Sequence, residues 1–257
     1  MNAKPAIIHS SAAASSERER LAAAVVSYGD AVGPFDALMR GYMMRTFAPW
    51  FADGACLQVG CAHGDQTSLL LERYDDLTVL EPDPTFIAHT RERLGDRAVF
   101  VEALLEDYET DRRFDTIVFS HVLEHVTDPV AALRRLGELL APDGRLYVVV
   151  PNAEAPSRRI AVKMGLFSHL EGLSAADEAA GHRRVYRLDT LQRDVAAAGL
   201  GAEHSGGILY KPLANFQFDA LIGGPLISHD FMEACYALGQ ERPSECASIF
   251  VVAKAVT

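Results

Sequence analysis

The sequence has few of the features that suit a membrane, a nucleic acid or an oxidising compartment. No apolar run approaches the roughly 20 residues that a membrane-spanning helix needs. Lysine and arginine number 24 against 35 aspartates and glutamates, a formal charge of −11, which repels phosphate backbones and anionic lipids. The four cysteines form no CxxC pair, so nothing calls for disulfide bonds. We therefore expect a cytoplasmic protein that binds neither nucleic acid nor membrane.

The N-terminal fifth of the chain differs in pattern from the rest. Residues 1–20 lack the basic start and apolar centre of a secretory signal, and their small, polar and charged residues predict a flexible tail. Residues 21–50 carry helical apolar spacing that breaks at Gly33-Pro34, which predicts a cap of two short helices. Residues 51–257 are predicted to form the main domain.

Short apolar runs alternate with helical patterns from residue 55 onward. The runs are continuous rather than alternating, which is typical of parallel strands covered by helices on both faces. We predict strands at 55–60, 77–82, 98–104, 114–122, 145–152, 204–213 and 245–256, and helices at 65–74, 84–95, 128–144 and 187–200. This pattern predicts an α/β fold with a doubly wound, mostly parallel, seven-stranded, Rossmann-like sheet.

Two insertions interrupt the alternation, at 153–185 and 214–245. Insertions of this length inside a compact domain are usually functional. We expect both, together with the N-terminal cap, to cover the site of a second substrate.

The turn after the first predicted strand contains two glycines four residues apart, Gly60 and Gly64. A nicotinamide-dinucleotide site favours GxGxxG, but here Ala62 and Asp65 stand in place of the second and third glycines. Glu81 ends the second strand, where a carboxylate can accept hydrogen bonds from both hydroxyls of a ribose. Together these features predict an adenosine-containing ligand.

These motifs resemble those of class I S-adenosylmethionine-dependent methyltransferases, and in particular the branch that tailors sugars and antibiotics. The resemblance covers about residues 50–200 and rests on "LQVGCAHGD", "VLEPD", "FVEALLEDY", "FDTIVFSHVLEHVTDP" and "LLAPDGRLYVVVPN". It implies S-adenosylmethionine as cofactor and S-adenosylhomocysteine as product. The cofactor-binding residues that it implies are Gln58, Gly60, Cys61, Ala62, Gly64, Glu81, Pro82, Ala103, Leu104, Ser120 and His121.

The stretch "SHVLEHV" places His121, Glu124 and His125 at i, i+3 and i+4, which share one face of a helical turn. A metal site needs a ligand from elsewhere, for which His182 is the candidate, and imidazoles favour zinc-like over magnesium-like ions. Alternatively, the turn is only the wall of a pocket. We favour a third hypothesis, in which His121 or His125 positions or deprotonates the acceptor, with His182 as the alternative base. This interpretation assigns no metal.

The acceptor is expected between the cap and the insertions. Arginines concentrated near the first insertion form either a solvated face or a clamp for an anion. The candidate substrate-binding residues are Tyr28, Tyr42, Arg158, Arg159, Arg183, Tyr186 and Lys211.

The resemblance implies methyl transfer to an oxygen or nitrogen of a small metabolite, such as a sugar or a natural-product intermediate, which is anionic if the arginines form a clamp. Two alternatives stay open. One is a nicotinamide-dependent oxidoreductase, and the other is a non-catalytic, cofactor-binding partner of another methyltransferase. We expect a monomer or a homodimer.

Overall fold

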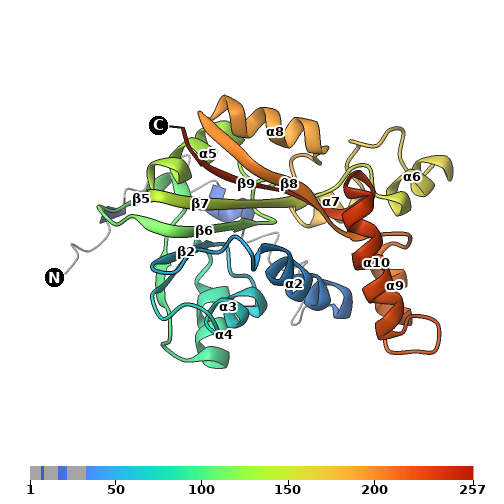
Figure 1. The fold of residues 1–257 in the computed structure, drawn as a ribbon, viewed down its shortest axis with the longest axis horizontal. Helices are drawn as coiled ribbons and strands as arrows, with labels where there is room; N and C mark the ends of the chain where they lie inside the picture. The colour runs from blue at the N-terminus through green and yellow to red at the C-terminus, as the bar shows by residue number, and fades with distance from the viewer. Residues whose placement is uncertain (1–6, 9–16, 22–32, 257) are drawn as a thin grey trace.

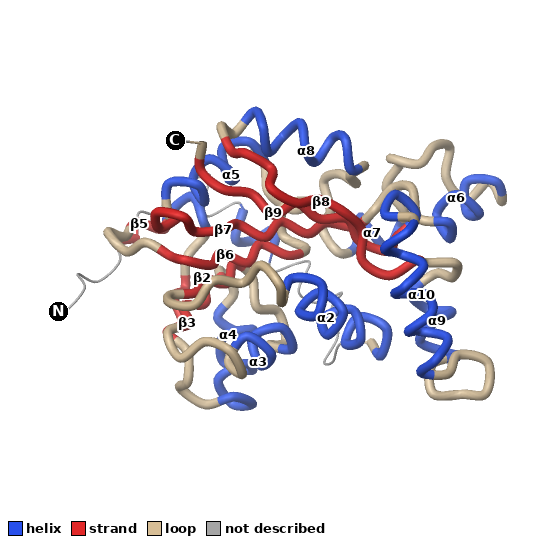
Figure 2. Tube along the Cα trace, in the orientation of Figure 1, coloured by secondary structure: helices blue, strands red, loops and turns tan. Residues whose placement is uncertain are grey.

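The computed structural model describes residues 7–8, 17–21 and 33–256 (Figure 1). Its centre is a seven-stranded sheet with the order β4-β3-β2-β6-β7-β9-β8. The strands are β2 (Cys56–Val59), β3 (Leu77–Glu81), β4 (Val99–Glu102), β6 (Phe114–Ser120), β7 (Leu140–Pro151), β8 (Leu200–Tyr210) and β9 (Cys246–Ala255). The first five strands in this order pair in parallel, and β9 is antiparallel to both β7 and β8 (Figure 2). The predicted fold class is confirmed.

Helices cover both faces of the sheet, with α5 and α8 on one face and α2 and α3 on the other (Figure 1). The helices are α2 (Pro34–Phe47), α3 (Asp65–Leu70), α4 (Pro84–Leu94), α5 (Pro129–Glu138), α6 (Pro156–Lys163), α7 (Ala175–Ala179), α8 (Leu188–Ala197), α9 (Asn215–Leu221) and α10 (His229–Glu241). Two helices, α4 and α5, begin with an aspartate followed by a proline. These aspartates, Asp83 and Asp128, each accept a backbone N–H of the first turn.

The core lies on both sides of the sheet, as the continuous apolar strands predict. Alternate residues of β7 face opposite layers: Val148 packs in the cluster that contains α5 and α8, whereas Tyr147 and Val149 pack in the cluster that contains α2 and α10. A third cluster fills the space between β2, β3, α3 and α4. The central strands are therefore buried on both faces and hold their ends in fixed positions.

Several predicted boundaries are wrong: the helix predicted at 65–74 ends at Leu70, and the strand predicted at 204–213 is Leu200–Tyr210. The largest difference is at the helix predicted at 128–144. The helix predicted at 128–144 ends at Glu138, and Leu140 already pairs with Phe114 on β6. Gly144 has a role in this early pairing, because a Cβ at this position would lie 2.7 Å from the Phe114 carbonyl oxygen. The strand thus approaches its neighbour more closely than a residue with a side chain would allow.

The N-terminal region contacts the domain where the structure describes it, although residues 1–20 are predicted to be a flexible tail. β1 (Ile7–Ile8) pairs antiparallel with β5 (Tyr108–Glu109), and residues 17–21 are helical. The second predicted cap helix corresponds to α2. The first predicted cap helix falls largely within 22–32, outside the described residues.

The two insertions carry helices of their own, α6 and α7 in the first and α9 and α10 in the second.

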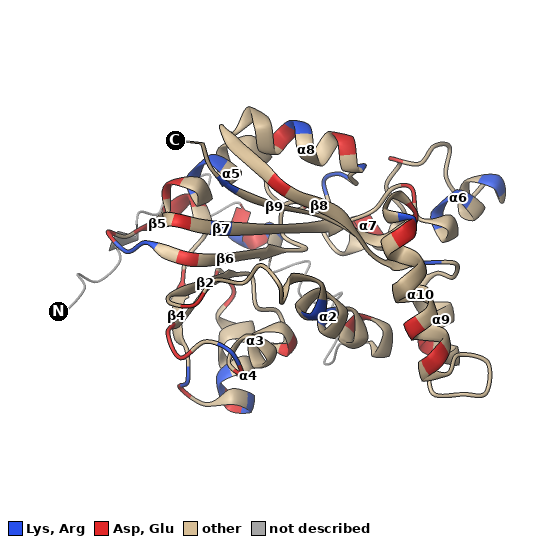
Figure 3. Ribbon diagram, viewed as in Figure 1, with Lys and Arg blue, Asp and Glu red and all other residues tan. Residues whose placement is uncertain are grey.

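Acidic and basic residues are interspersed along the elements, and several basic residues lie on α6 (Figure 3). Within the described ranges, no helix has the length and apolarity that crossing a membrane requires.

Candidate functional site

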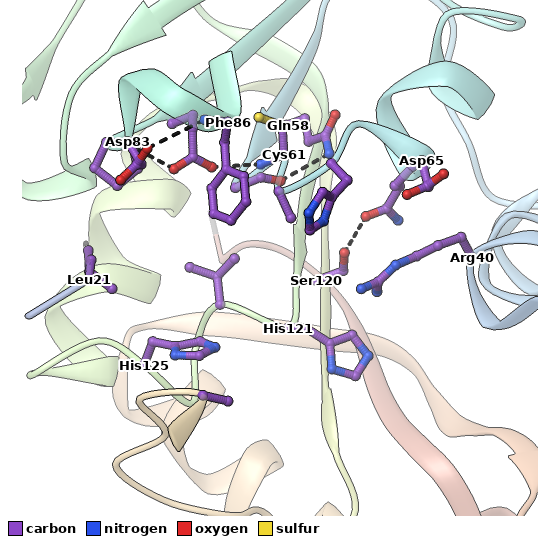
Figure 4. A pocket seen from close by; sticks show the side chains of 18 residues that line it. Leu21, Arg40, Gln58, Cys61, Asp65, Asp83, Phe86, Ser120, His121 and His125 are labelled. Atoms are coloured by element: carbon purple, nitrogen blue, oxygen red, sulfur yellow. Dashed lines mark hydrogen bonds between the residues drawn. The ribbon is translucent and has the colours of Figure 1, made fainter. Parts of the chain in front are cut away.

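A cavity lies beyond the carboxyl ends of β2, β3 and β6 (Figure 4). This is the edge at which open parallel sheets bind ligands. It encloses about 930 Å³, counting the part that is open to solvent, which suits a cofactor-sized molecule. It is lined by Leu21, Arg40, Gln58, Gly60, Cys61, Ala62, His63, Asp65, Gln66, Glu81, Pro82, Asp83, Phe86, Ser120, His121, Val122, His125 and Ala180.

The glycine turn forms one wall of this cavity. Gly60 has a φ of +79°, and a Cβ there would lie 2.7 Å from Cγ2 of Val122. A side chain at this position would thus be both strained and crowded. Ala62 also has a positive φ, +44°, a strained backbone of the kind that gathers at functional sites.

The carboxylate of Glu81 is fixed at the end of β3. Its Oε2 accepts the Cys61 N–H at 2.9 Å, and its Oε1 accepts the Asp83 N–H at 3.0 Å. Burial raises the pKa of Glu81, although these N–H groups act to lower it. The backbone N–H of Ala62 also acts on this carboxylate. A carboxylate has about four lone-pair sites, so it keeps the capacity to accept from a ribose hydroxyl.

Two buried glutamines add polar atoms to the cavity wall. Gln58 Nε2 donates to the Gly60 carbonyl at 3.0 Å, and Gln66 Oε1 accepts the hydroxyl of Ser120. The other amide atoms, Gln58 Oε1 and Gln66 Nε2, have no hydrogen-bond partner among the described residues. Buried polar atoms normally have a partner, so these two atoms are suited to a polar ligand.

Arg40 is a cation in the wall that sequence reasoning missed. It lies on α2, beside Ser120 and far across the cavity from Asp83 (Figure 4). Its Nη1 lies 3.7 Å from Sδ of Met43, and it forms no ion pair with an acid in the described part of the chain. The sequence signal that could have identified Arg40 is its position as a cation on the helix that begins at Pro34, which belongs to the predicted cap.

The histidine stretch is a turn after β6 rather than a helix, which corrects the predicted helical geometry. The helix does not form here because His121 has a φ of +55°, in the left-handed region. The turn nevertheless brings the predicted residues together. Nδ1 of His121 lies 3.4 Å from Oε1 of Glu124, and Nε2 of His121 lies 3.2 Å from Oγ of Ser248.

Glu124 is fully buried at the centre of this cluster. Burial acts to raise its pKa, but His121 and the nearby His125 and His182 outweigh that effect, so the pKa lies below its usual range. Burial lowers the pKa of His125, although Glu124 opposes this. At neutral pH the cluster therefore combines an ionised carboxylate with a neutral imidazole.

His182 reaches the cluster from the first insertion. Its ring packs edge-on against that of His125, with centroids 4.8 Å apart. Its Nδ1 donates to Oδ1 of Asp177 at 3.0 Å, and several hydrogen bonds to the Asp177 carboxylate hold that residue's pKa well below normal despite burial. His121 and His125 line the cavity, whereas His182 lies behind them.

Most of the predicted cofactor residues lie together at the cavity. Those in its wall are Gln58, Gly60, Cys61, Ala62, Glu81, Pro82, Ser120 and His121. Gly64 instead begins α3 with a φ of +82°, and Ala103 and Leu104 are buried outside the wall. Sequence reasoning missed several wall residues, among them Asp83, Phe86, Gln66 and Leu21.

Arg158 does not line the cavity, and its contacts favour a structural role. Its guanidinium donates to the carbonyls of Leu170 and Gly172 and to the carboxylate of Asp177, and it lies over the ring of Phe167. These contacts hold together the loop between α6 and α7.

The other two predicted clamp arginines also have partners within the chain. Arg159 pairs with Glu154 at 3.0 Å and is half exposed. Arg183 donates to the His125 carbonyl and pairs with Glu17. Neither lines the cavity, so this geometry does not support an anion clamp.

The remaining predicted acceptor residues lie away from the cavity wall. The hydroxyl of Tyr42 donates to Glu233, and that of Tyr186 donates to Asp194, both from buried rings. Lys211 lies beneath α2, with Nζ 5.4 Å from the ring centroid of Phe35, and burial lowers its pKa to about 8. Tyr28 is outside the described residues.

The helical segment 17–21 crosses from the cofactor side to the histidine side. Arg18 Nη1 donates to the Pro82 carbonyl at 3.4 Å. Arg20 donates to the carbonyls of Gly181 at 2.8 Å and His125 at 3.0 Å, and Leu21 reaches the wall. This segment therefore closes one side of the cavity.

The chain is similar to known methyltransferases. Nodulation protein S of Bradyrhizobium diazoefficiens is 37% identical over 97 residues, which cover 36% of this chain and 46% of that protein. The N-methyltransferase NodS of Bradyrhizobium japonicum, crystallised with S-adenosyl-L-homocysteine, has a TM-score of 0.57 and 16% identity, covering 95% of this chain and 98% of its own. The 1,6-didemethyltoxoflavin-N1-methyltransferase of Burkholderia thailandensis has a TM-score of 0.60 and 19% identity, covering 100% and 94%.

The matches with the first curated relatives span less than half of those proteins' length, and the structural matches establish the fold. The methyltransferase domain family matches residues 35–205, which is more than half of the chain. This chain therefore belongs to the methyltransferase domain family.

Proposed function

We propose that the protein transfers a methyl group from S-adenosylmethionine to an oxygen or nitrogen of a small metabolite. The observation that carries the proposal is the buried Glu81 carboxylate, fixed to the glycine turn and still able to accept from a ribose hydroxyl. NodS and the 1,6-didemethyltoxoflavin-N1-methyltransferase were both crystallised with S-adenosylhomocysteine, which supports this choice of cofactor.

The wall residues suit the parts of this cofactor. Glu81 would hold the ribose. Gln58 and Gln66 offer unpartnered amide atoms to the amino-acid portion, and Arg40, which lies on the same side as Ser120, would pair with its carboxylate. In this proposal, the residue that pairs with the cofactor carboxylate is Arg40. Arg158, Arg159 and Arg183 do not line the cavity.

The bound cofactor supplies a methyl group already activated by a sulfonium. The protein must therefore mainly hold the acceptor in line with that group, which contributes up to about 7–11 kcal/mol in the best cases. A base is needed only where the acceptor loses a proton during attack.

We assign the base role to His121. It lines the cavity, and its Nδ1 faces the Glu124 carboxylate at 3.4 Å. An N–H on Nδ1 would place the lone pair on Nε2, as when a carboxylate orients a basic imidazole. Because Nε2 lies 3.2 Å from Oγ of Ser248, the acceptor would replace this contact. His125 and His182 are the alternatives: Nδ1 of His125 contacts a backbone carbonyl rather than a carboxylate, and His182 does not line the cavity.

The acceptor is proposed to be a small natural-product or sugar intermediate. The 1,6-didemethyltoxoflavin-N1-methyltransferase was crystallised with 1,6-didemethyltoxoflavin and S-adenosylhomocysteine, and a cavity of about 930 Å³ suits small molecules rather than a macromolecule. The four cysteines are free and buried, which suits a reducing compartment such as the cytoplasm.

The test combines binding with turnover. Calorimetry should give micromolar binding of S-adenosylhomocysteine and no binding of NADH. Isotope-labelled cofactor is then offered with a panel of hydroxyl and amine compounds, and methylated products are identified by mass spectrometry. Binding of NADH in place of S-adenosylhomocysteine would favour an oxidoreductase. Cofactor binding without transfer to any panel member would favour the non-catalytic alternative.

A further inference from the structure

The fully buried Glu124 has an unusual environment. Neither of its oxygens accepts a hydrogen bond of ordinary geometry from the described residues, and Nδ1 of His121 lies 3.4 Å from Oε1. A buried charge is normally paired, hydrogen-bonded or bound to a metal, because leaving water costs several kcal/mol. One oxygen can face the Nδ1 atom of His121 while the other faces a bound cation.

Two imidazoles lie where such a cation would bind. His125, His182 and Glu124 each offer one ligand atom, and these three atoms lie within 4.8 Å of one another. His125 comes from the turn after β6, and His182 comes from the insertion after β7. The three groups therefore meet only through the tertiary fold.

The surroundings of the two imidazoles fix their orientation. Nδ1 of His182 donates to Oδ1 of Asp177 at 3.0 Å, and Nδ1 of His125 donates to the Gly181 carbonyl at 3.3 Å. Asp177 is itself held by Ser174. A neutral imidazole that donates from Nδ1 carries its lone pair on Nε2, and metal-binding histidines almost always have such an outer acceptor.

We propose that Glu124, His125 and His182 bind a divalent transition-metal cation, with Zn²⁺ as the best match. Two imidazoles and one carboxylate suit zinc, iron or manganese, whereas Mg²⁺ and Ca²⁺ prefer oxygen ligands. Ligand atoms of a zinc site lie about 3–4 Å apart, so the side chains close in by roughly 1 Å on binding.

Three protein ligands leave a coordination position open. His125 lines the cavity, so this position lies next to the space where the acceptor is proposed to bind, and an acceptor oxygen or nitrogen would complete the coordination. Only this last step rests on the proposed methyl transfer. Cation binding itself does not depend on it.

The experiment measures metal binding directly. Full-length protein is freed of metal with a chelator and titrated with Zn²⁺ by calorimetry. Co²⁺ substitution is followed by visible absorption, which reports coordination by protein ligands. We expect one Zn²⁺ per chain, an affinity at least 100-fold above that for Mg²⁺, and a Co²⁺ spectrum that Zn²⁺ displaces.

Variants connect the binding to these residues. Glu124→Gln and His182→Ala should each weaken Zn²⁺ binding at least tenfold, and Zn²⁺ should raise the melting temperature of the wild type but not of either variant. His169→Ala, an exposed histidine of the same insertion, should bind as the wild type does. Circular dichroism identifies a variant that fails to fold, in which case the other variant decides.

No saturable Zn²⁺ binding in the wild type, or equal binding in both folded variants, would overturn the proposal. Titration with S-adenosylhomocysteine in the same samples separates this failure from failure of the proposed function. Intact cofactor binding without zinc binding rejects the metal site alone.

Discussion

The backbone N–H of Cys61 donates to Oε2 of Glu81 at 2.9 Å, which fixes the acid at the end of β3 to the glycine turn after β2. Two adjacent parallel strands thus present the turn and the carboxylate to the same cavity. This hydrogen bond sets the position of the carboxylate relative to the turn.

Glu81→Gln should weaken S-adenosylhomocysteine binding by about 10- to 100-fold, because a hydrogen bond to a charged group contributes about 1.5–3 kcal/mol. Calorimetry measures this change. Glu102→Gln is the matched control, since Glu102 pairs with Glu81 in register but is exposed on the neighbouring strand. Equal affinity in the Glu81 variant and the wild type would remove this residue from the ribose site.

His121→Asn should lower turnover by about 10²–10⁴-fold at saturating acceptor, the usual contribution of a general base. Asparagine tolerates the left-handed backbone that His121 adopts, so the turn should survive. The affinity for S-adenosylhomocysteine, measured alongside, should change much less than turnover. If His121→Asn keeps wild-type turnover while His125→Ala or His182→Ala loses it, the base is the histidine whose replacement lowers turnover.

Arg20→Ala should raise the dissociation rate of S-adenosylhomocysteine by about 5- to 20-fold. The guanidinium holds segment 17–21 to the Gly181 and His125 carbonyls, and charged hydrogen bonds of this kind contribute about 1.5–3 kcal/mol when shielded from water. Stopped-flow displacement gives the rate. Glu19→Ala, at an exposed position of the same segment, should leave it unchanged. If both variants behave alike, the segment does not close the cavity.

Arg158→Ala should lower the free energy of unfolding by about 2–4 kcal/mol, because it leaves Asp177 and two carbonyls without their partner. Arg159→Ala should cost at most about 1 kcal/mol, as expected for an exposed pair. Urea denaturation measures both. A stable Arg158 variant with a raised acceptor KM would restore the anion-clamp hypothesis.

Lys211→Met should change how stability depends on pH. Burial lowers the pKa of Lys211 to about 8 from 10.5, so between these values the unfolded chain binds more protons than the folded one. The contribution of Lys211 to the free energy of unfolding therefore rises with pH across this window, by about 3 kcal/mol. The variant should lack this rise.

Urea denaturation at pH 7.5, 8.5 and 9.5 provides the measurement for Lys211. The quantity compared is the difference in the free energy of unfolding between the variant and the wild type at each pH. Tyr42, whose pKa burial raises to about 12, has the opposite effect on the pH dependence, but it is present in both proteins and cancels. Lys163→Met, an exposed lysine of α6, serves as the control. Parallel stability curves for the wild type and the Lys211 variant would show that the ammonium is well solvated.

The sequence by itself determined the fold class and the part of the site formed by the glycine turn and Glu81. Continuous apolar strands, capped helices and glycine-ended turns are local signals, so they predicted seven strands and placed Gly60 and Glu81 at one sheet edge. Helix 128–144 was predicted too long, because the close approach of Gly144 to Phe114 is a contact between strands that no local pattern records.

Only the tertiary structure decided which charged groups face the cavity. Arg158 and Arg183 form a basic concentration in the sequence, yet folding pairs them with carbonyls and acids, whereas Arg40 reaches the wall from a helix remote in sequence. The sequence also favoured a base over a metal at the histidine turn. The proposed cation site depends on His182 lying close to Glu124, whose oxygens accept no hydrogen bond of ordinary geometry from the described residues. This burial and long-range proximity arise only when the insertion packs against the sheet.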